Sequence, residues 1–492
     1  MADEVADVRP PGIGDEDLDV KRFQDVDESA KVIVERHGTG DEHMLISAKN
    51  WEELELDDKL LDGIYNEGFL RPSKIQELAL PIICFRPGYT PQNLIAQAQN
   101  GSGKTAAFSL GLLSQIDFAW GVPQAMVLCH TRELARQNGA VIERLGTFAG
   151  VRVQMVVSTL GSTKRETMDK TAHVLVGTPG KMRDVTKKRI LGVNDIRCLV
   201  LDEADVMLGQ DMGSQVHSVR QLLREPSFLQ VLFFSATFPE EVRRFAISVV
   251  PNPNVISVRN EDLAVEDTTQ VYVKAESDEE KFQLLCDLYG AMSVGQSIVF
   301  FNTRRKAFAI AKRLQEEGHT VSLICGSQTT GPEKLDPAER DRVMDEFRSG
   351  KTKLLVSTDV LSRGIDVPQV TLVVNFEIPT VFEHASEAEQ GYDGDQSNGK
   401  GKSKGGKGKG KGKGGYKGKG GVSREKMAQM ETYLHRVGRT GRFGLKGFAV
   451  NLVNSREQDL LMQIRDYFNC KITEIDADFE QLEKDLEGLR SQ

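Results

Sequence analysis

Short apolar runs separated by longer amphipathic stretches follow one another along most of the chain. Between residues 92 and 237, helix-length stretches alternate with the runs QNLIAQ, QAMVLCH, HVLVGT, RCLVLD and QVLFFSAT. The alternation returns between residues 297 and 453 with SIVFFNT, TVSLIC, KLLVST, VTLVVNF and GFAVNLV. Near-continuous apolar strands that alternate with helices are typical of parallel sheets buried on both faces. We therefore predict an α/β fold of two tandem domains, each a parallel sheet covered by helices on both faces.

The two predicted domains are flanked by acidic ends. The parts are, in chain order, an acidic and largely disordered extension (1–48), a first domain (49–260), a linker (261–269), a second domain (270–475) with a disordered insertion (386–426), and an acidic C-terminal helix (476–492). We predict disorder for the extension because of its charge: residues 1–30 hold ten acidic residues against three basic ones. The linker is the later part of VVPNPNVISVRNEDLAVEDTTQ, which has two prolines and a charged stretch.

The composition indicates a soluble protein, with 39% hydrophobic and 27% charged residues. No apolar run reaches the ~20 residues that cross a bilayer, and the first residues, MADEVADVRP, are acidic where a signal peptide is basic. Six scattered cysteines without a CxxC pair indicate reduced thiols. We expect an intracellular protein that does not insert into membranes.

A glycine-rich loop follows the strand NLIAQ and precedes the helical stretch AAFSLGLLSQI. Strand, glycine loop and helix in this order form the context of a phosphate-binding loop. Backbone N–H groups turn toward the phosphates at the positive end of the helix, Lys104 supplies charge for the β and γ phosphates, and Thr105 offers its hydroxyl to Mg2+. The loop consists of Ala98, Gln99, Asn100, Gly101, Ser102, Gly103, Lys104 and Thr105. An ordinary glycine turn before a helix is the alternative.

Three acidic residues follow another buried strand, CLVL, in the sequence Asp202-Glu203-Ala204-Asp205. Beside a phosphate loop, a carboxylate at a strand end can hold Mg2+, and its neighbour can orient and deprotonate the attacking water. We assign Asp202 to the metal and Glu203 to the water. The four letters alone are a weak signal, because acids often cap helices after strands.

Three arginines, Arg436, Arg439 and Arg442, lie three residues apart in YLHRVGRTGR near the end of the second half. Guanidinium groups suit a phosphate that is being transferred. Lys104 lies in the other half of the chain, so the predicted site is complete only when the two halves close on each other.

Taken in order, these motifs resemble those of the DEAD-box ATP-dependent RNA helicases. The resemblance extends to GFLRPSKIQ, HTRELA, TPGK, FFNTR and STDVLSRGID, and it covers residues 49–475 apart from the insertion. It implies two RecA-like domains, with ATP and Mg2+ as cofactors and single-stranded RNA or mRNA–protein particles as ligands. An ordered set of about ten motifs is a specific signal.

The resemblance also implies roles for individual residues. Gln76 would recognise the adenine edge and Trp51 would pack on its ring, although a purely buried anchor is an open alternative for Trp51. Backbone contacts to RNA would come from Thr131, Arg132, Thr178, Gly180, Thr303, Arg304 and Thr358. Asp366 would lie near the ribose, and Arg436 and Arg439 would contact the γ phosphate. Coupling between the ATP and RNA sites would involve Asp205, Ser235, Thr237 and His435.

Some residues depart from the family pattern on the RNA side. His130 stands in place of the usual proline, Lys181 in place of arginine, and Leu160 opens a segment where a glycine pair is expected. Within the family, passages such as RPSKIQELALP and ETYLHRVGRTGRFG are most similar to the mRNA-export subgroup. That similarity implies a monomer in cytoplasm and nucleus, at the nuclear pore, with a nucleoporin and an inositol-phosphate-dependent activator as partners.

The expected function is RNA-stimulated ATP hydrolysis coupled to local RNA unwinding and removal of proteins from RNA. An ATP-gated RNA clamp with little unwinding would carry nearly the same motifs, so it stays open as an alternative. A DNA translocase fits poorly, because the GFLRPSKIQ block and the combined spacing resemble the RNA group.

The insertion carries a charge pattern of its own. Residues 399–421 hold nine lysines, twelve glycines and no acid, so the net charge of −9 becomes −9 − 9 = −18 for the rest of the chain. Such a segment cannot fold alone, because glycine maximises chain entropy and the lysines repel one another. It is either a mobile cationic tether for RNA or a solvated spacer, and contact with the acidic extension is a further possibility.

Deleting residues 399–421 tests the tether. If the lysines contact RNA phosphates, the slope of log affinity against log salt becomes shallower by as much as ~0.7 per contacting charge. Fluorescence anisotropy with a single-stranded RNA over a salt series measures this slope, and an unchanged slope leaves only the spacer. A second deletion, of residues 1–30, tightens RNA binding at low salt if the acidic extension occupies the lysines.

Overall fold

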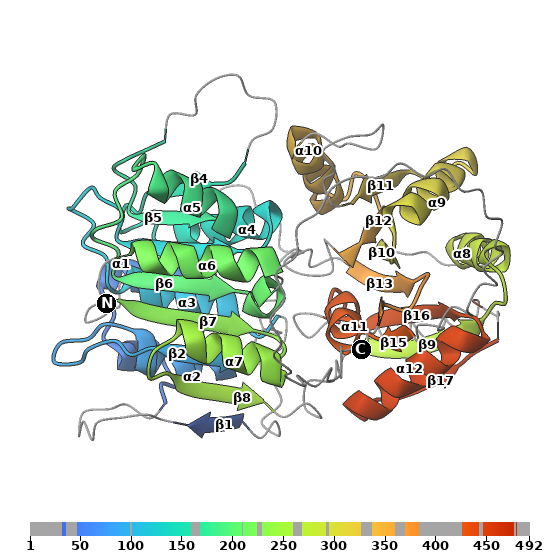
Figure 1. Cartoon of the computed structure of the whole chain (residues 1–492), viewed down its shortest axis with the longest axis horizontal. Helices are drawn as coiled ribbons and strands as arrows, with labels where there is room; N and C mark the ends of the chain where they lie inside the picture. The colour runs from blue at the N-terminus through green and yellow to red at the C-terminus, as the bar shows by residue number, and fades with distance from the viewer. Residues whose placement is uncertain are drawn as a thin grey trace, which may run out of the picture.

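This computed structural model describes residues 32–35, 47–98, 101–158, 168–208, 210–223, 229–258, 268–291, 295–325, 337–359, 370–382, 426–441, 446–476 and Phe479 (Figure 1). Most of the predicted extension, insertion and C-terminal helix lies outside these residues, as do Gln99, Asn100, Leu160, Asp366 and Arg442. Among the described helices, none combines the length and the apolar character needed to cross a bilayer.

The first half is built on one sheet in which neighbouring strands run parallel except at one edge. Its strands are β1 (Val32–Glu35), β2 (Leu94–Gln97), β3 (Ala125–Cys129), β4 (Val153–Val156), β5 (Val174–Gly177), β6 (Cys198–Asp202), β7 (Gln230–Ser235) and β8 (Asn254–Val258). Their order is β1-β8-β2-β7-β6-β3-β5-β4, and only β1 pairs antiparallel, with β8. The central strands are buried along their whole length, which explains their continuous apolar sequences.

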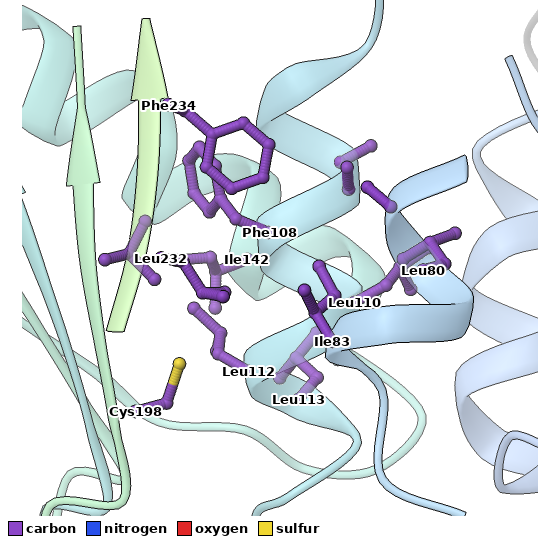
Figure 2. Close-up of a cluster of buried hydrophobic side chains, with 14 of the residues drawn as sticks. Leu80, Ile83, Phe108, Leu110, Leu112, Leu113, Ile142, Cys198, Leu232 and Phe234 are labelled. Carbon is purple, nitrogen blue, oxygen red and sulfur yellow. The ribbon is translucent and has the colours of Figure 1, made fainter. Parts of the chain in front are cut away.

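Helices cover both faces of this sheet. They are α1 (Asp58–Asn66), α2 (Lys74–Ile83), α3 (Lys104–Leu113), α4 (Arg132–Leu145), α5 (Pro179–Lys187), α6 (Gln210–Leu222) and α7 (Glu240–Val249), with the short 3-10 turns η2 (Glu52–Leu54) and η3 (Ala204–Leu208). Alternate residues of β7 point to opposite faces: Phe234 joins the core under α1 to α4, and Phe233 joins the core under α5 to α7. Figure 2 shows the first of these cores, where the rings of Phe108 and Phe234 lie 5.5 Å apart.

The second half repeats the plan with a fully parallel sheet. Its strands are β9 (Thr268–Lys274), β10 (Gln296–Phe301), β11 (Val321–Ile324), β12 (Leu354–Thr358), β13 (Val370–Asn375), β16 (Gly447–Val453) and β17 (Ile472–Glu474), in the order β11-β12-β10-β13-β16-β9-β17. The helices are α8 (Asp278–Ala291), α9 (Arg304–Glu316), α10 (Pro337–Arg348), α11 (Met430–Val437) and α12 (Ser455–Phe468). Residues from α8 and α9 pack on one face, and those from α10, α11 and α12 on the other. The predicted fold class is confirmed.

Described strands reach into the predicted extension, linker and insertion. The strand β1 lies inside the predicted disordered extension, because its β-branched run VIV pairs with the edge of β8. The strand β9 begins at Thr268, inside the predicted linker 261–269, because it pairs with β16 along the full length of that strand. Lys426, the last residue of the predicted insertion, pairs with Phe382 where β14 (Thr380–Phe382) meets β15 (Lys426–Ala428).

Replacing a ring of the first core should lower stability strongly. Phe108 is fully buried, so Phe108→Ala removes its contacts and leaves a cavity, with an expected loss of roughly 3–5 kcal/mol. Phe85 is half-exposed, so Phe85→Ala changes the free energy of unfolding by about 0.5 kcal/mol or less. Urea denaturation of the two variants measures both values. Equal losses would contradict the assigned core.

Candidate active site

The glycine-rich loop depends on backbone conformations that favour glycine. Gly101 has φ 82° and Gly103 has φ 96°, and Gly103 is the N-cap of α3. A Cβ added to Gly103 would lie 2.7 Å from Nε2 of Gln76 and 2.9 Å from Oγ of Ser73. Both the left-handed conformation and the crowding therefore exclude a side chain at this position.

The start of α2 holds this loop in place. Ser73 Oγ donates to the carbonyl oxygen of Ser102 at 2.7 Å, and Gln76 Nε2 donates to that of Gly103 at 3.1 Å. Gln76 Oε1 also accepts from the backbone N–H of Ser73 at 2.8 Å. Gln76 thus braces the phosphate loop, a contact that the sequence did not reveal. Its contact with adenine stays a prediction.

Trp51 is a buried anchor in this structure, which was the open alternative. The side chain is 0% exposed, and its indole N–H donates to the carbonyl oxygen of Phe69 at 2.8 Å. In this structure Trp51 supports the segment that leads into α2. Its packing on an adenine ring stays a prediction.

Lys104 begins α3 and points back into the loop, where Nζ donates to the carbonyl oxygen of Ala98 at 2.6 Å. Burial lowers the pKa of Lys104, and the like charge of Arg439 acts in the same direction. The acidic groups of Glu203, Asp202 and Asp205 oppose this shift, in that order of strength. Lys104 of the first half and Arg439 of the second half are therefore coupled electrostatically.

Asp202 ends β6 with both carboxylate oxygens hydrogen-bonded. Oδ2 accepts from Asn138 Nδ2 at 2.7 Å, and Oδ1 accepts from the backbone N–H of Glu203 at 3.0 Å. Burial, and next the charge of Glu203, raise the pKa of Asp202 to about 7. A buried carboxylate with a raised pKa favours a nearby cation. Asp202 thus fits its predicted place beside Mg2+, as does the hydroxyl of Thr105, the second residue of α3.

The pKa of Glu203 is shifted in the opposite direction to that of Asp202. Burial acts to raise its pKa, but attraction to Lys104, His435 and Arg439 prevails and lowers the pKa below its usual value. Its backbone has φ 51°, a left-handed conformation that is uncommon for a residue other than glycine. Adjacent carboxyl groups whose environments move their pKa values apart are suited to different tasks.

The predicted coupling residues meet where the two halves touch. Asp205 Oδ2 accepts from Thr237 Oγ1 at 3.0 Å and lies 3.3 Å from His435 Nε2, which belongs to α11 of the second half. Ser235 Oγ donates to the carbonyl oxygen of Thr237 at 2.7 Å. Potential ligand atoms of Glu203, Asp205 and His435 lie within 4.8 Å of one another. This group includes a ring nitrogen, so it suits Mg2+ less well than the oxygens of Thr105 and Asp202.

Arg436 is enclosed by hydrogen-bond acceptors of the second half. Its guanidinium is 0% exposed and donates to Asp359 Oδ1 at 2.7 Å, to the carbonyl oxygen of Glu377 at 2.7 Å and to Asn302 Oδ1 at 2.8 Å. Asn375 Oδ1 lies 3.4 Å from the same group. These partners all belong to the second half, so Arg436 braces that half in this structure. Its contact with a γ phosphate stays a prediction.

Arg439 lies where a phosphate contact is feasible. Its Nε donates to the carbonyl oxygen of His435 at 3.0 Å, and its side chain is buried. Its charge acts on the pKa values of both Lys104 and Glu203 across the junction of the halves. Lys104, Glu203 and Arg439 are thus all buried and electrostatically coupled, and the catalytic roles of these residues and of Arg436 stay predictions.

The predicted RNA contacts gather at the N-termini of helices that follow strands. Thr131, Thr178 and Thr303 are the N-caps of α4, α5 and α9. Arg132 and Arg304 are the first residues of α4 and α9, Gly180 lies in the first turn of α5, and Thr358 ends β12. Helix N-termini bind phosphates through backbone N–H groups, which explains why these residue types follow the strands.

A set of ion pairs joins α4 of the first half to α10 of the second. Asp341 lies 3.4 Å from Arg132 and 2.8 Å from Arg136, and Arg340 lies 3.0 Å from Glu133. The sequence did not identify this contact, because α10 shows only a mixed charge pattern. Of the three departures, His130 and Lys181 are half-buried next to the N-termini of α4 and α5, and Leu160 lies outside the described residues.

Comparisons with known proteins agree with this geometry. The model of the DEAD/DEAH box helicases matches residues 73–245, and that of the helicase conserved C-terminal domain matches residues 280–444. The chain belongs to the DEAD/DEAH box helicase family, and it is an ATP-dependent RNA helicase. It is 41% identical over 442 residues to the ATP-dependent RNA helicase DDX25 of Homo sapiens, covering 89% of this chain and 80% of the relative.

Two solved structures of a further relative are similar over most of the chain. S. cerevisiae Dbp5 bound to RNA and ADP BeF3 superposes with a TM-score of 0.75 at 36% identity, covering 90% of this chain and 100% of that one. A variant of S. cerevisiae Dbp5 bound to Nup159, a Gle1 variant, IP6 and ADP gives a TM-score of 0.57 at 34% identity, covering 89% and 100%.

The two arginines should respond differently to substitution. Arg436→Ala removes the hydrogen bonds to Asp359, Asn302 and the carbonyl oxygen of Glu377, so we expect a loss of about 3 kcal/mol in the stability of the second half, limited by the partial exposure of Asp359. Arg439→Ala should instead slow ATP turnover by roughly 10³-fold, the lower range for an arginine that stabilises a transferring phosphate. Calorimetry and steady-state ATPase assays measure these effects, and the reverse pattern would contradict both assignments.

Proposed function

We propose that the protein hydrolyses ATP when RNA draws its two halves together, and that this closure locally unwinds RNA and removes proteins from it. One observation carries the proposal: Glu203 and Asp205, which follow β6, have carboxylate oxygens within 4.8 Å of a ring nitrogen of His435 in α11, and Lys104 and Arg439 are buried and electrostatically coupled to Glu203. A nucleotide in the loop would place its terminal phosphate between Lys104 and Arg439. Binding of RNA and ATP would then favour the same closed arrangement.

The proposed roles follow from the chemistry of each group. Backbone N–H groups at the start of α3 and Lys104 hold the phosphates. Thr105 and Asp202 would hold Mg2+, which neutralises phosphate charge when bound. Glu203, kept ionised by its cationic neighbours, accepts a proton from the attacking water. Arg439 stabilises the charge that develops on the phosphate, while Asp205 and His435 connect the halves.

On the RNA side, the helix N-termini at Thr131, Thr178 and Thr303 suit a phosphate backbone. Such contacts fix the register of the chain without recognising bases, so we propose binding of single-stranded RNA with little sequence preference. The pairing of Arg132 with Asp341 lies at the same edge, so closure of the halves and the RNA surface share residues.

We further propose that the protein acts in mRNA export, in cytoplasm and nucleus and at the nuclear pore, as a monomer. The similarity to S. cerevisiae Dbp5 in complex with Nup159, Gle1 and IP6 supports this proposal. The partners would be a nucleoporin and an inositol-phosphate-dependent activator. If the ATPase rate of the protein responds to the nucleoporin and the activator together, and to inositol hexakisphosphate, that result would agree with this assignment.

Glu203→Gln tests the proposed base. The amide cannot accept the proton, so turnover should fall by roughly 10²- to 10⁴-fold while ATP binding is retained. Steady-state ATPase rates and binding of a fluorescent ATP analogue measure the two quantities. Glu240→Gln, at an exposed acid in the first turn of α7, is the matched control and should leave both unchanged. Normal turnover in the Glu203 variant would refute the assignment.

The dependence of the ATPase rate on RNA concentration separates the helicase from the clamp. The proposal predicts a rate that rises with RNA and saturates, together with strand separation of a short duplex. An ATP-gated clamp would bind RNA with ATP but show negligible stimulation and little unwinding.

A further inference from the structure

An amide side chain from α4 reaches the carboxylate that ends β6. Asn138 is 0% exposed, and its Nδ2 group lies 2.7 Å from Asp202 Oδ2 and 3.3 Å from Cys129 Sγ. Neither the sequence motifs nor the proposed mechanism assign a task to this residue. A polar side chain is costly to bury, so its contact with a functional carboxylate calls for an explanation.

The contact has one chemically sensible orientation. Asp202 is ionised when it binds a cation, and an ionised carboxylate only accepts hydrogen bonds, so the NH2 group of Asn138 faces it. The other carboxylate oxygen, Oδ1, accepts from the backbone N–H of Glu203. Both oxygens of Asp202 are therefore held by groups of the protein, and the plane of the carboxylate is set before a cation arrives.

The helix that carries Asn138 is itself firmly placed. Thr131 caps α4 by accepting from the backbone N–H of Leu134 at 3.2 Å. One residue after Asn138, a Cβ added to Gly139 would lie 2.9 Å from Met155 Sδ, so the helix lies close against β4. Asn138 follows Arg132 by six residues, or about 9 Å along the helix axis. The residue therefore has little freedom to leave Asp202.

We propose that Asn138 is a positioning residue that holds Asp202 in the orientation in which it binds the Mg2+ of the nucleotide. This inference rests on the proposed function, because it takes Asp202 as a metal ligand. Hydrogen bonds to a ligating carboxylate orient it, and their loss typically weakens metal binding by roughly 10- to 100-fold.

The experiment compares Mg2+-dependent nucleotide binding in two variants. Asn138→Ala removes the donor and leaves a cavity, whereas Asn138→Leu removes the donor and fills the space. The full-length protein is titrated with MgCl2 in the presence of mant-ATP, and fluorescence reports nucleotide binding without turnover. In EDTA, both variants should bind mant-ATP as the wild type does. Both should need a roughly 10- to 100-fold higher Mg2+ concentration to reach half of the Mg2+-dependent fluorescence change.

Two control variants separate the possible explanations. Ile142→Val loosens the buried side of the same helix without touching Asp202, so its Mg2+ requirement should equal that of the wild type. Asp202→Asn should abolish the Mg2+-dependent change. If it does and both Asn138 variants match the wild type, the inference on Asn138 is overturned while the proposed function stands. If Asp202→Asn keeps the wild-type Mg2+ requirement, the metal assignment fails and the inference fails with it.

Discussion

The junction between the two halves depends on buried polar and charged groups that meet across it. Asp205 of the first half meets His435 of the second at 3.3 Å, and both side chains are buried. Charged groups that leave water need partners, so the two halves stabilise each other only in arrangements in which these groups meet. A phosphate bound near Lys104 and Arg439 would be attracted to both cations, one from each half.

The parallel sheets explain why so many functional groups share this junction. Carboxyl ends of parallel strands lie at one edge of a sheet, and the helices that follow begin there with their positive ends. In the first half this edge carries the phosphate loop after β2, Thr131 after β3 and Asp202 after β6. In the second half it carries Thr303 after β10. The topology of the parallel sheets, rather than unusual local structure, therefore explains why the candidate nucleotide and RNA groups share one edge.

The sequence predicted the features that local pattern determines. Apolar runs located the central strands, and the glycine loop located the start of α3. Each of these signals is contained within a few consecutive residues. It did not separate Arg436 from Arg439, since only the folded second half shows which guanidinium is surrounded by acceptors. Trp51 was likewise ambiguous, because burial depends on contacts with Phe69 far along the chain. Asn138 gave no signal, because its partner Asp202 lies 64 residues away.

The central claim is that groups from both halves surround one nucleotide tail, and crosslinking from the γ phosphate tests it most directly. An ATP analogue with a photoreactive group on that phosphate would be bound with single-stranded RNA, irradiated and mapped by mass spectrometry. The account predicts labelled peptides from the phosphate loop and from α11 in the same sample, with the α11 label increased by RNA. Labels confined to the first half, with and without RNA, would contradict it.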